Sequence, residues 1–145
     1  MSRLTASTAA EGVRAVYGVE QYCQATIDGP LYELIKLRAS VLNGCSYCVD
    51  MHSRDALAHG EDTRKLFAVA AWREAPFFTD RERAALALTD SVTRLGPDGV
   101  PDDVWKPAAA LFTEKELADL VLGIATINLW NRLNIATRNE PPVTV

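Results

Sequence analysis

The sequence predicts an all-α protein with about six to seven helices. No segment shows the sustained alternation of apolar and polar residues that is typical of β-strands. Apolar residues recur instead at spacings of three, four and seven, which place them on one helical face. Gly, Pro and Asp separate these segments, and two capping boxes, Thr79 with Glu82 and Thr113 with Glu116, mark helix starts.

The first three helices are expected in the amino-terminal half of the chain. The first covers Val13–Ile27 and ends before Asp28-Gly29-Pro30. Pro30 suits the first turn of the second helix, which presents apolar residues from Leu31 to Leu42 on one face and stops at Asn43-Gly44. The third helix covers Cys45–Ala58, and Gly60 follows it as a carboxy-terminal stop.

The second half of the chain is expected to add four more helical segments. The two capping boxes each open a helix, and the turn-rich stretch Gly96–Gly99 separates them from one another. The expected segments are Asp62–Trp72, Thr79–Leu95, Asp102–Phe112 and Leu117–Ala136.

Length and composition favour one globular, cytoplasmic domain over residues 1–145, with flexible tails at 1–10 and 140–145. The net charge of −4 argues against nucleic acid as a partner. No apolar run approaches the ~18 residues that span a membrane, and the first residues lack the apolar stretch of a secretory signal. In the cytoplasm, thiols are reduced by default.

The main candidates for catalytic or metal-binding residues lie in the stretch from Cys45 to His52. Cys45 and Cys48 form a C-x-x-C pair. In a cytosolic protein this motif indicates a redox or metal site rather than a structural disulfide. The preceding Gly44 suggests that both cysteines lie in the first helical turn, where the helix dipole favours the thiolate. His52 follows Cys48 by one turn and can therefore take up or deliver its proton.

Glu33 is the fourth residue of interest. A short turn at Asn43-Gly44 would fold the second and third helices into an antiparallel hairpin and bring Glu33 beside the third helix. A partly buried carboxylate there is expected to have a raised pKa and to act as a base or relay. An exposed glutamate on a helix surface is the common alternative.

Glu33, then eleven residues, then Cys45, Cys48 and His52 resembles the signature of the alkylhydroperoxidase D-like branch of the carboxymuconolactone decarboxylase superfamily. The similarity covers roughly residues 30–95. It implies an all-α fold, assembly into homotrimers or homohexamers, and thiol-dependent reduction of organic hydroperoxides. No cofactor is implied beyond an external thiol reductant or a redox partner protein.

The resemblance also implies a role for each site residue. Cys48 would attack the peroxide and become a sulfenic acid, Cys45 would resolve it to a disulfide, and Glu33 and His52 would relay the proton. In the best-known members a histidine directly precedes the second cysteine. Tyr47 stands there in this chain, so we expect a shorter relay or a Tyr47 that only shapes the pocket.

Several alternatives remain open from the residues. The cysteines could serve a thiol–disulfide adapter with little peroxidase activity, bind zinc together with His52, or simply be buried. Lactone decarboxylation is a poor fit, because members with that activity typically lack the cysteine pair. The polar stretch Asn128–Asn134 is a polar stripe at a subunit interface, a wall near the thiols, or the surface of an amphipathic helix. Cys23 is expected in the core, and His59 at a helix carboxy-terminus.

Overall fold

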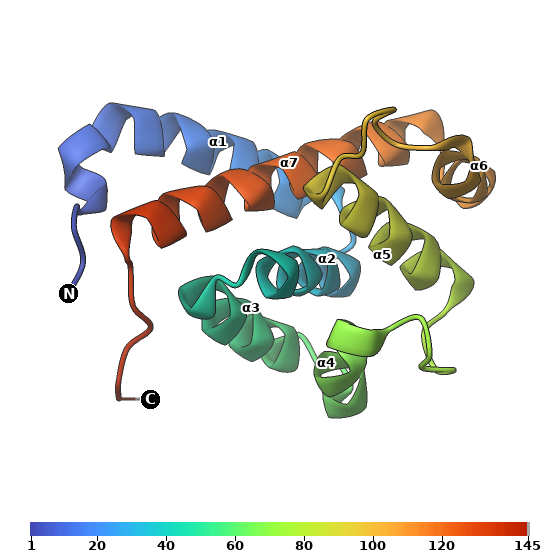
Figure 1. Cartoon of the computed structure of the whole chain (residues 1–145), viewed down its shortest axis with the longest axis horizontal. Coiled ribbons are helices and arrows are strands. Elements are labelled where there is room, and N and C mark those ends of the chain that lie inside the picture. The colour runs from blue at the N-terminus through green and yellow to red at the C-terminus, as the bar shows by residue number, and fades with distance from the viewer. Residues whose placement is uncertain (145) are drawn as a thin grey trace.

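The computed structural model describes residues 1–144, and over this range it is all-α, with seven α-helices and no β-strand (Figure 1). Residue 145, the last of the expected carboxy-terminal tail, lies outside the described residues. The expected helix at 62–72 is divided into α4 and a 3-10 turn, η2. The elements are η1 (Ala6–Ala9), α1 (Ala10–Thr26), α2 (Gly29–Asn43), α3 (Ser46–Ala58), α4 (Thr63–Ala68), η2 (Val69–Ala71), α5 (Asp80–Thr93), α6 (Asp102–Leu111) and α7 (Glu114–Thr137).

Helix α2 is the centre of the molecule and packs against α3, α5 and α7 (Figure 1). All residues from Leu31 to Leu37 are buried, so the helix is enclosed on every side. Such a helix is normally apolar all round. Its polar residues Glu33, Lys36 and Ser40 must therefore find partners inside the protein, and this requirement creates the site described below.

Two groups of apolar side chains pack on α2. One lies toward α1, α5, α6 and α7, where Tyr32 and Ile35 meet Leu88 and Ile124. The other lies toward α3, α4 and α5, and includes Leu34, Leu37 and Trp72. Every helix therefore uses α2, directly or through a neighbour, as its common support.

Local sequence signals set the ends of α2. Asp28 caps the helix by accepting a hydrogen bond from the backbone N–H of Leu31, and Pro30 lies in the first turn. Gly44 ends it with a positive φ of 71°, a conformation that suits glycine. Because Gly44 is followed at once by Cys45, the N-cap of α3, the α2–α3 connection is short. Both predicted capping boxes are confirmed.

Arg38 joins α2 to the segment around η2 and α5. Its guanidinium contacts both carboxylate oxygens of Asp90, at 2.6 and 3.2 Å, and donates to the carbonyls of Val69 and Ala70. Trp72 donates to the same aspartate. This network fixes α5 and the segment around η2 against α2.

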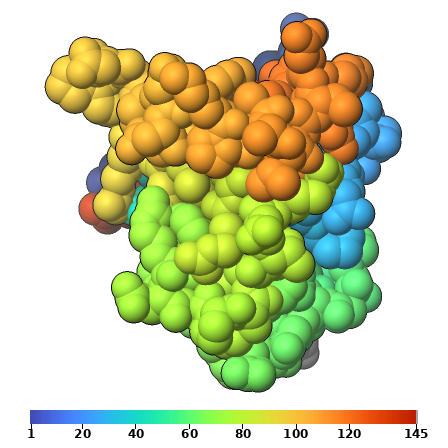
Figure 2. Space-filling model, turned by 90° about the vertical axis from the view of Figure 1, so that its right-hand side faces the viewer, coloured from blue at the N-terminus to red at the C-terminus, as the bar shows by residue number. Residues whose placement is uncertain are grey.

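A groove of about 640 Å³ runs between α5 and α6 and is lined by Trp72, Arg83, Val104 and Leu111, among others. Figure 2 shows this end of the molecule, with α6 above and the α4–α5 region below. At the opposite end the two termini lie together, and the backbone N–H of Arg3 donates to the carbonyl of Thr137. Within residues 1–144, no helix combines the length and apolar character needed to cross a membrane.

Candidate active site

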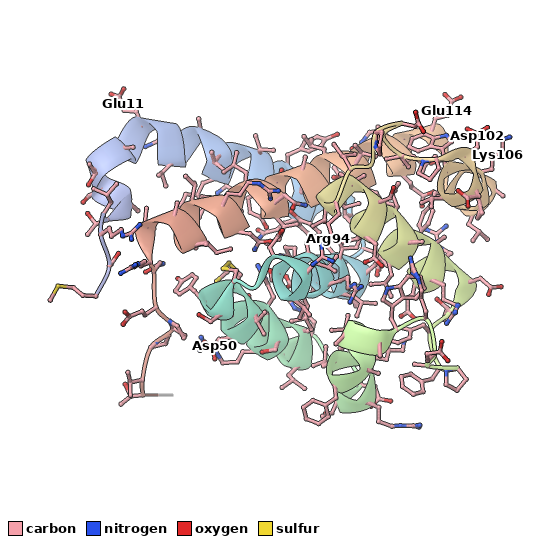
Figure 3. All side chains as sticks on the ribbon, in the orientation of Figure 1. Glu11, Asp50, Arg94, Asp102, Lys106 and Glu114 are labelled. Atoms are coloured by element: carbon pink, nitrogen blue, oxygen red, sulfur yellow. A yellow bond between two sulfur atoms is a disulfide. The ribbon has the colours of Figure 1, made fainter. Side chains whose placement is uncertain are left out.

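Cys45 and Cys48 are joined by a disulfide at the amino-terminal end of α3, beneath α7 (Figure 3). Cys45 is the N-cap, and its sulfur accepts a hydrogen bond from the Cys48 N–H at 3.3 Å. Both residues are buried, at 2% and 1% exposure. The side-chain amide of Asn134 on α7 lies 3.6 Å from the Cys48 sulfur. The helix dipole and this amide both favour negative charge on Cys48.

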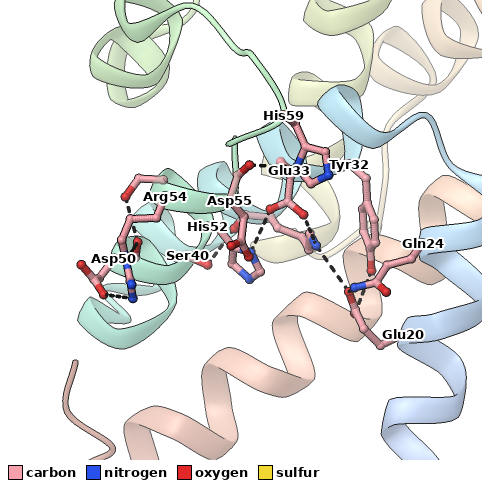
Figure 4. A network of polar contacts seen from close by, with 12 residues as sticks. Glu20, Gln24, Tyr32, Glu33, Ser40, Asp50, His52, Arg54, Asp55 and His59 are labelled. Atoms are coloured by element: carbon pink, nitrogen blue, oxygen red, sulfur yellow. Dashed lines mark hydrogen bonds and ion pairs between the residues drawn. The ribbon is translucent and has the colours of Figure 1, made fainter. Parts of the chain in front are cut away.

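His52 and Glu33 form a buried pair across the α2–α3 hairpin (Figure 4). Glu33 Oε2 accepts a hydrogen bond from His52 Nδ1 at 3.0 Å. The expectation that the short turn returns Glu33 to the side of α3 is confirmed. With Nδ1 engaged, Nε2 is the ring nitrogen left to exchange a proton, one helical turn from Cys48.

The expected raised pKa of Glu33 is wrong. Burial alone would raise the pKa of Glu33, but hydrogen bonds from His52 and Lys36 lower it below its ordinary value. Lys36 Nζ lies 2.6 Å from Glu33 Oε1, so both oxygens of the carboxylate have cationic or N–H partners. Glu33 is therefore ionised at neutral pH and orients His52, whereas His52 is the group suited to act as the base.

The polar contacts continue beyond the four residues that the sequence indicated. Lys36 Nζ also lies 3.4 Å from Glu20 Oε1 on α1, and the Tyr32 hydroxyl donates to Glu20 Oε2 at 2.9 Å. Lys36 and Glu20 are both buried. These two residues were not predicted from the sequence, although the spacing of Glu33 and Lys36 is that of an i, i+3 ion pair.

The asparagines of α7 face the protein interior rather than forming a surface stripe. Asn131 is fully buried, donates to Ser40 Oγ and accepts from Asn43 Nδ2. Asn128 accepts from the same Asn43 amide. With Asn134 beside Cys48, these side chains form the wall near the thiols that was one of the alternatives. They also hold Asn43, two residues before Cys45.

Three other residues singled out in the sequence lie as follows. Tyr47 is half-buried in the first turn of α3, between the two cysteines. Cys23 is fully buried on α1, as expected for a core residue, and burial raises the pKa of its thiol. His59 caps the end of α3, as expected, with Nδ1 2.8 Å from the Asp55 carbonyl oxygen.

The proposed zinc set of Cys45, Cys48 and His52 is not available in this state, because the disulfide leaves no thiolate. Glu33, His52 and Asp55 bring one donor atom each within 4.8 Å of one another. Both oxygens of Glu33 are already engaged by Lys36 and His52. We therefore assign no metal ion to this group.

The geometry can be compared with known proteins. The model of the carboxymuconolactone decarboxylase family matches residues 8–91, which include Glu33, both cysteines and His52. The chain belongs to the carboxymuconolactone decarboxylase family. Within it, the chain is an AhpD-like member with a C-x-x-C disulfide.

Relatives support this assignment over nearly the whole chain. The uncharacterised protein YdfG of Bacillus subtilis is 39% identical over 133 residues, 91% of this chain and 90% of YdfG. The crystal structure of a protein of unknown function from Agrobacterium tumefaciens is 36% identical, with a TM-score of 0.95 and 99% of each chain covered.

A third relative is more distant and supports the fold alone. It is a peroxidase-related protein with an alkylhydroperoxidase AhpD core from Ralstonia eutropha, 21% identical with a TM-score of 0.84. The similarity covers 97% of this chain and 75% of that one. The AhpD-like fold expected from the resemblance is thus confirmed.

Proposed function

We propose that the protein is a thiol-dependent peroxidase that reduces organic hydroperoxides through Cys48 and Cys45. The observation that carries the proposal is the Cys45–Cys48 disulfide next to a buried His52–Glu33 pair. A dithiol that closes a disulfide and a base fixed by an ionised carboxylate are the two parts such a cycle needs. The Agrobacterium relative has been suggested to be the antioxidant defence protein AhpD, which agrees with this chemistry.

The proposed cycle begins with transfer of the Cys48 proton to His52. The Cys48 thiolate attacks the terminal peroxide oxygen and the O–O bond breaks. Cys48 becomes a sulfenic acid, and the alkoxide leaves as an alcohol with the proton from His52. The Cys45 thiol then attacks the sulfenic sulfur, forms the disulfide and releases water. Two electrons from an external thiol reductant or a redox partner protein restore both thiols. This requirement fits the reducing cytoplasm.

Peroxide consumption by the reduced protein tests the proposal. With one equivalent of cumene hydroperoxide, we expect loss of two thiols per chain and formation of the Cys45–Cys48 disulfide. Cys48→Ser should abolish consumption. Cys23→Ser is the matched control, because Cys23 is a buried cysteine outside the disulfide, and it should retain the wild-type rate.

The same experiment distinguishes the alternative of a thiol–disulfide adapter. An adapter would exchange disulfides with a partner protein and leave both thiols intact after addition of hydroperoxide. If Cys48→Ser consumed peroxide at the wild-type rate, Cys48 could not be the residue that reacts with the peroxide, and the proposal would be wrong.

We also propose that the protein assembles as a homotrimer or homohexamer. Leu122, Leu129 and Leu133 of α7 are each about 40% exposed and follow a helical spacing. Leu129 and Leu133 also line an apolar groove of about 500 Å³ with Val92 and Leu95. Light scattering at micromolar concentration tests this assembly, and a monomer there would contradict it. Leu129→Arg should weaken the oligomer if this face is buried in it.

A further inference from the structure

The buried charges near the disulfide form one connected group that reaches from α3 to α1. His52 contacts Glu33, Glu33 contacts Lys36 at 2.6 Å, and Lys36 contacts Glu20 at 3.4 Å (Figure 4). Lys36 is 1% exposed, and a lysine is almost never buried to this degree unless it is paired. The Lys36 ammonium thus has two carboxylate partners, one on its own helix and one on α1.

Glu20 is held in place from two further sides. The Tyr32 hydroxyl donates to its Oε2 at 2.9 Å, and Gln24 Nε2 lies 3.3 Å from its Oε1. Tyr32 is itself buried, and its ring lies under the Lys36 ammonium, with Nζ 4.2 Å from the ring centroid. Lys36, Tyr32 and Gln24 together fix the position of the Glu20 carboxylate.

The charges of this group do not cancel while His52 is neutral. Two carboxylates and one ammonium leave one negative charge in excess, from Glu20, Glu33 and Lys36. A proton on His52 brings the group to neutrality. The excess negative charge is therefore a counter-charge for a proton that arrives on His52.

Charged groups on α3 and on the helices packed against it do not reverse this balance. On its own helix, Asp55 lies near His52 and Glu33 and adds negative charge. From α4, Lys65 pairs with Glu82, and Arg64 lies over the Phe77 ring. Helix α7, which also packs on α3, contributes the uncharged Asn134 beside Cys48.

We propose that Glu20 and Lys36 are positioning residues of the thiol site. Both act on His52 through Glu33: the Lys36 ammonium partly neutralises the Glu33 carboxylate, and Glu20 offsets the charge of Lys36, so that Glu33 remains an effective counter-charge for the proton that Cys48 releases to His52. The use of this proton in peroxide reduction rests on the proposed function. The proton transfer from the Cys48 thiol to the His52 imidazole is independent of that function, because it involves no oxidant.

Removal of the Glu20 charge should shift the pH at which the Cys48 thiolate forms in a definite direction. In Glu20→Gln the group is already neutral with an unprotonated His52, so a proton there would leave one positive charge in excess. The Cys48 thiolate should then form at higher pH. The glutamine keeps the size of the side chain, and its oxygen can still accept from Tyr32.

The test measures alkylation of Cys48 by iodoacetamide in the fully reduced protein as a function of pH, with the modified residue identified by mass spectrometry. We expect Glu20→Gln to move the midpoint upward by about half a pH unit or more. Glu11→Gln is the matched control, since it removes the same charge from an exposed position on α1, and it should leave the midpoint in place. An unchanged or lower midpoint in Glu20→Gln would overturn the proposal.

Lys36→Met keeps the proposal testable if Glu20→Gln does not fold. Loss of the ammonium makes the group more negative, so we expect the midpoint to move to lower pH. A merely structural role for Lys36 predicts the opposite, because a displaced Glu33 would make His52 a poorer base. An unchanged or higher midpoint in Lys36→Met would count against the proposal. Alkylation uses no peroxide, so its outcome is independent of whether the protein is a peroxidase.

Discussion

Glu33 and His52 lie 19 residues apart in the chain, yet the His52 ring donates to the Glu33 carboxylate over 3.0 Å inside the α2–α3 hairpin. The carboxylate fixes which ring nitrogen carries the hydrogen and stabilises the imidazolium when it forms. Lys36 keeps Glu33 ionised from its other oxygen. The pair thus combines a fixed base with a permanent counter-charge.

Glu33→Gln should slow the reaction of Cys48 without unfolding the protein. The glutamine cannot supply the negative charge that stabilises protonated His52, whereas Lys36 retains Glu20 as a partner. We expect the rate of hydroperoxide reduction to fall by about 10–100-fold, the range found for carboxylates that orient a metal-bound histidine. Stopped-flow measurement of peroxide loss checks this, with the exposed Glu11→Gln as control. A rate within twofold of wild type would show that Glu33 is not needed.

The lowered pKa of Glu33 also predicts how stability depends on pH. Hydrogen bonds from His52 and Lys36 outweigh burial and hold the pKa below its ordinary value of 4.5. The stability that this carboxylate contributes is therefore fully present above pH 4.5 and is lost as pH falls through the lower, folded-state pKa. Urea unfolding from pH 7 to pH 3 should show a smaller decline in Glu33→Gln than in wild type. Equal declines would contradict the ionised Glu33 described above.

The sequence predicts the order of the helices because each boundary depends on neighbouring residues. The break at Asp28-Gly29-Pro30, the turn at Asn43-Gly44 and the capping box at Thr79 are all local signals, and all are confirmed. The division of the fourth helix was missed. There Arg38 of α2 bonds to the carbonyls of Val69 and Ala70, and the structure has a 3-10 turn at this point. That contact joins residues about thirty positions apart, which no local pattern reports.

The site was predicted where residues share one helix or one short turn. Cys45, Cys48 and His52 share one helix, and the short turn at Asn43-Gly44 returns Glu33 to them. Asn134 was indicated only as one of several alternatives, and Glu20, which reaches the site through the packing of α1 on the rest of the fold, was missed. The direction of the Glu33 pKa was wrong for the same reason, since burial was foreseen but the Lys36 contact was not.

Gly123 on α7 is predicted to tolerate no side chain. A Cβ there would lie 2.7 Å from Ile27 Cδ1 and 3.0 Å from Tyr32 Cε2. The Ile27 methyl can shift, but the Tyr32 ring is held by its bond to Glu20. Overpacking of this kind costs about 1–3 kcal/mol, more than the ~1 kcal/mol that alanine contributes to a helix. Gly123→Ala should therefore lower the free energy of unfolding.

Gly18→Ala is the matched control for Gly123→Ala. Gly18 also lies inside a helix, but a Cβ there meets nothing within 4 Å. Its substitution should raise the free energy of unfolding by about 0.5–1 kcal/mol through helix propensity alone. Denaturant unfolding of both variants gives the comparison, and stabilisation by Gly123→Ala would mean that α7 and α2 are less closely packed than described.

Asn131 is predicted to stabilise the turn that carries Cys45. Its side chain is fully buried, donates to Ser40 Oγ at 3.0 Å and accepts from Asn43 Nδ2 at 2.9 Å. Asn131→Leu removes both bonds and leaves polar groups of Ser40 and Asn43 facing an apolar side chain, at a cost of about 1–3 kcal/mol. Gln21→Leu, at an exposed position on α1, should change the free energy of unfolding by less than about 0.5 kcal/mol. Chemical denaturation of both variants measures the difference.

Because Asn43 lies two residues before Cys45, Asn131→Leu should also slow closure of the disulfide after peroxide addition, whereas Gln21→Leu should not. Equal stability of the two variants would mean that the asparagines of α7 contribute nothing to the α2–α3 turn.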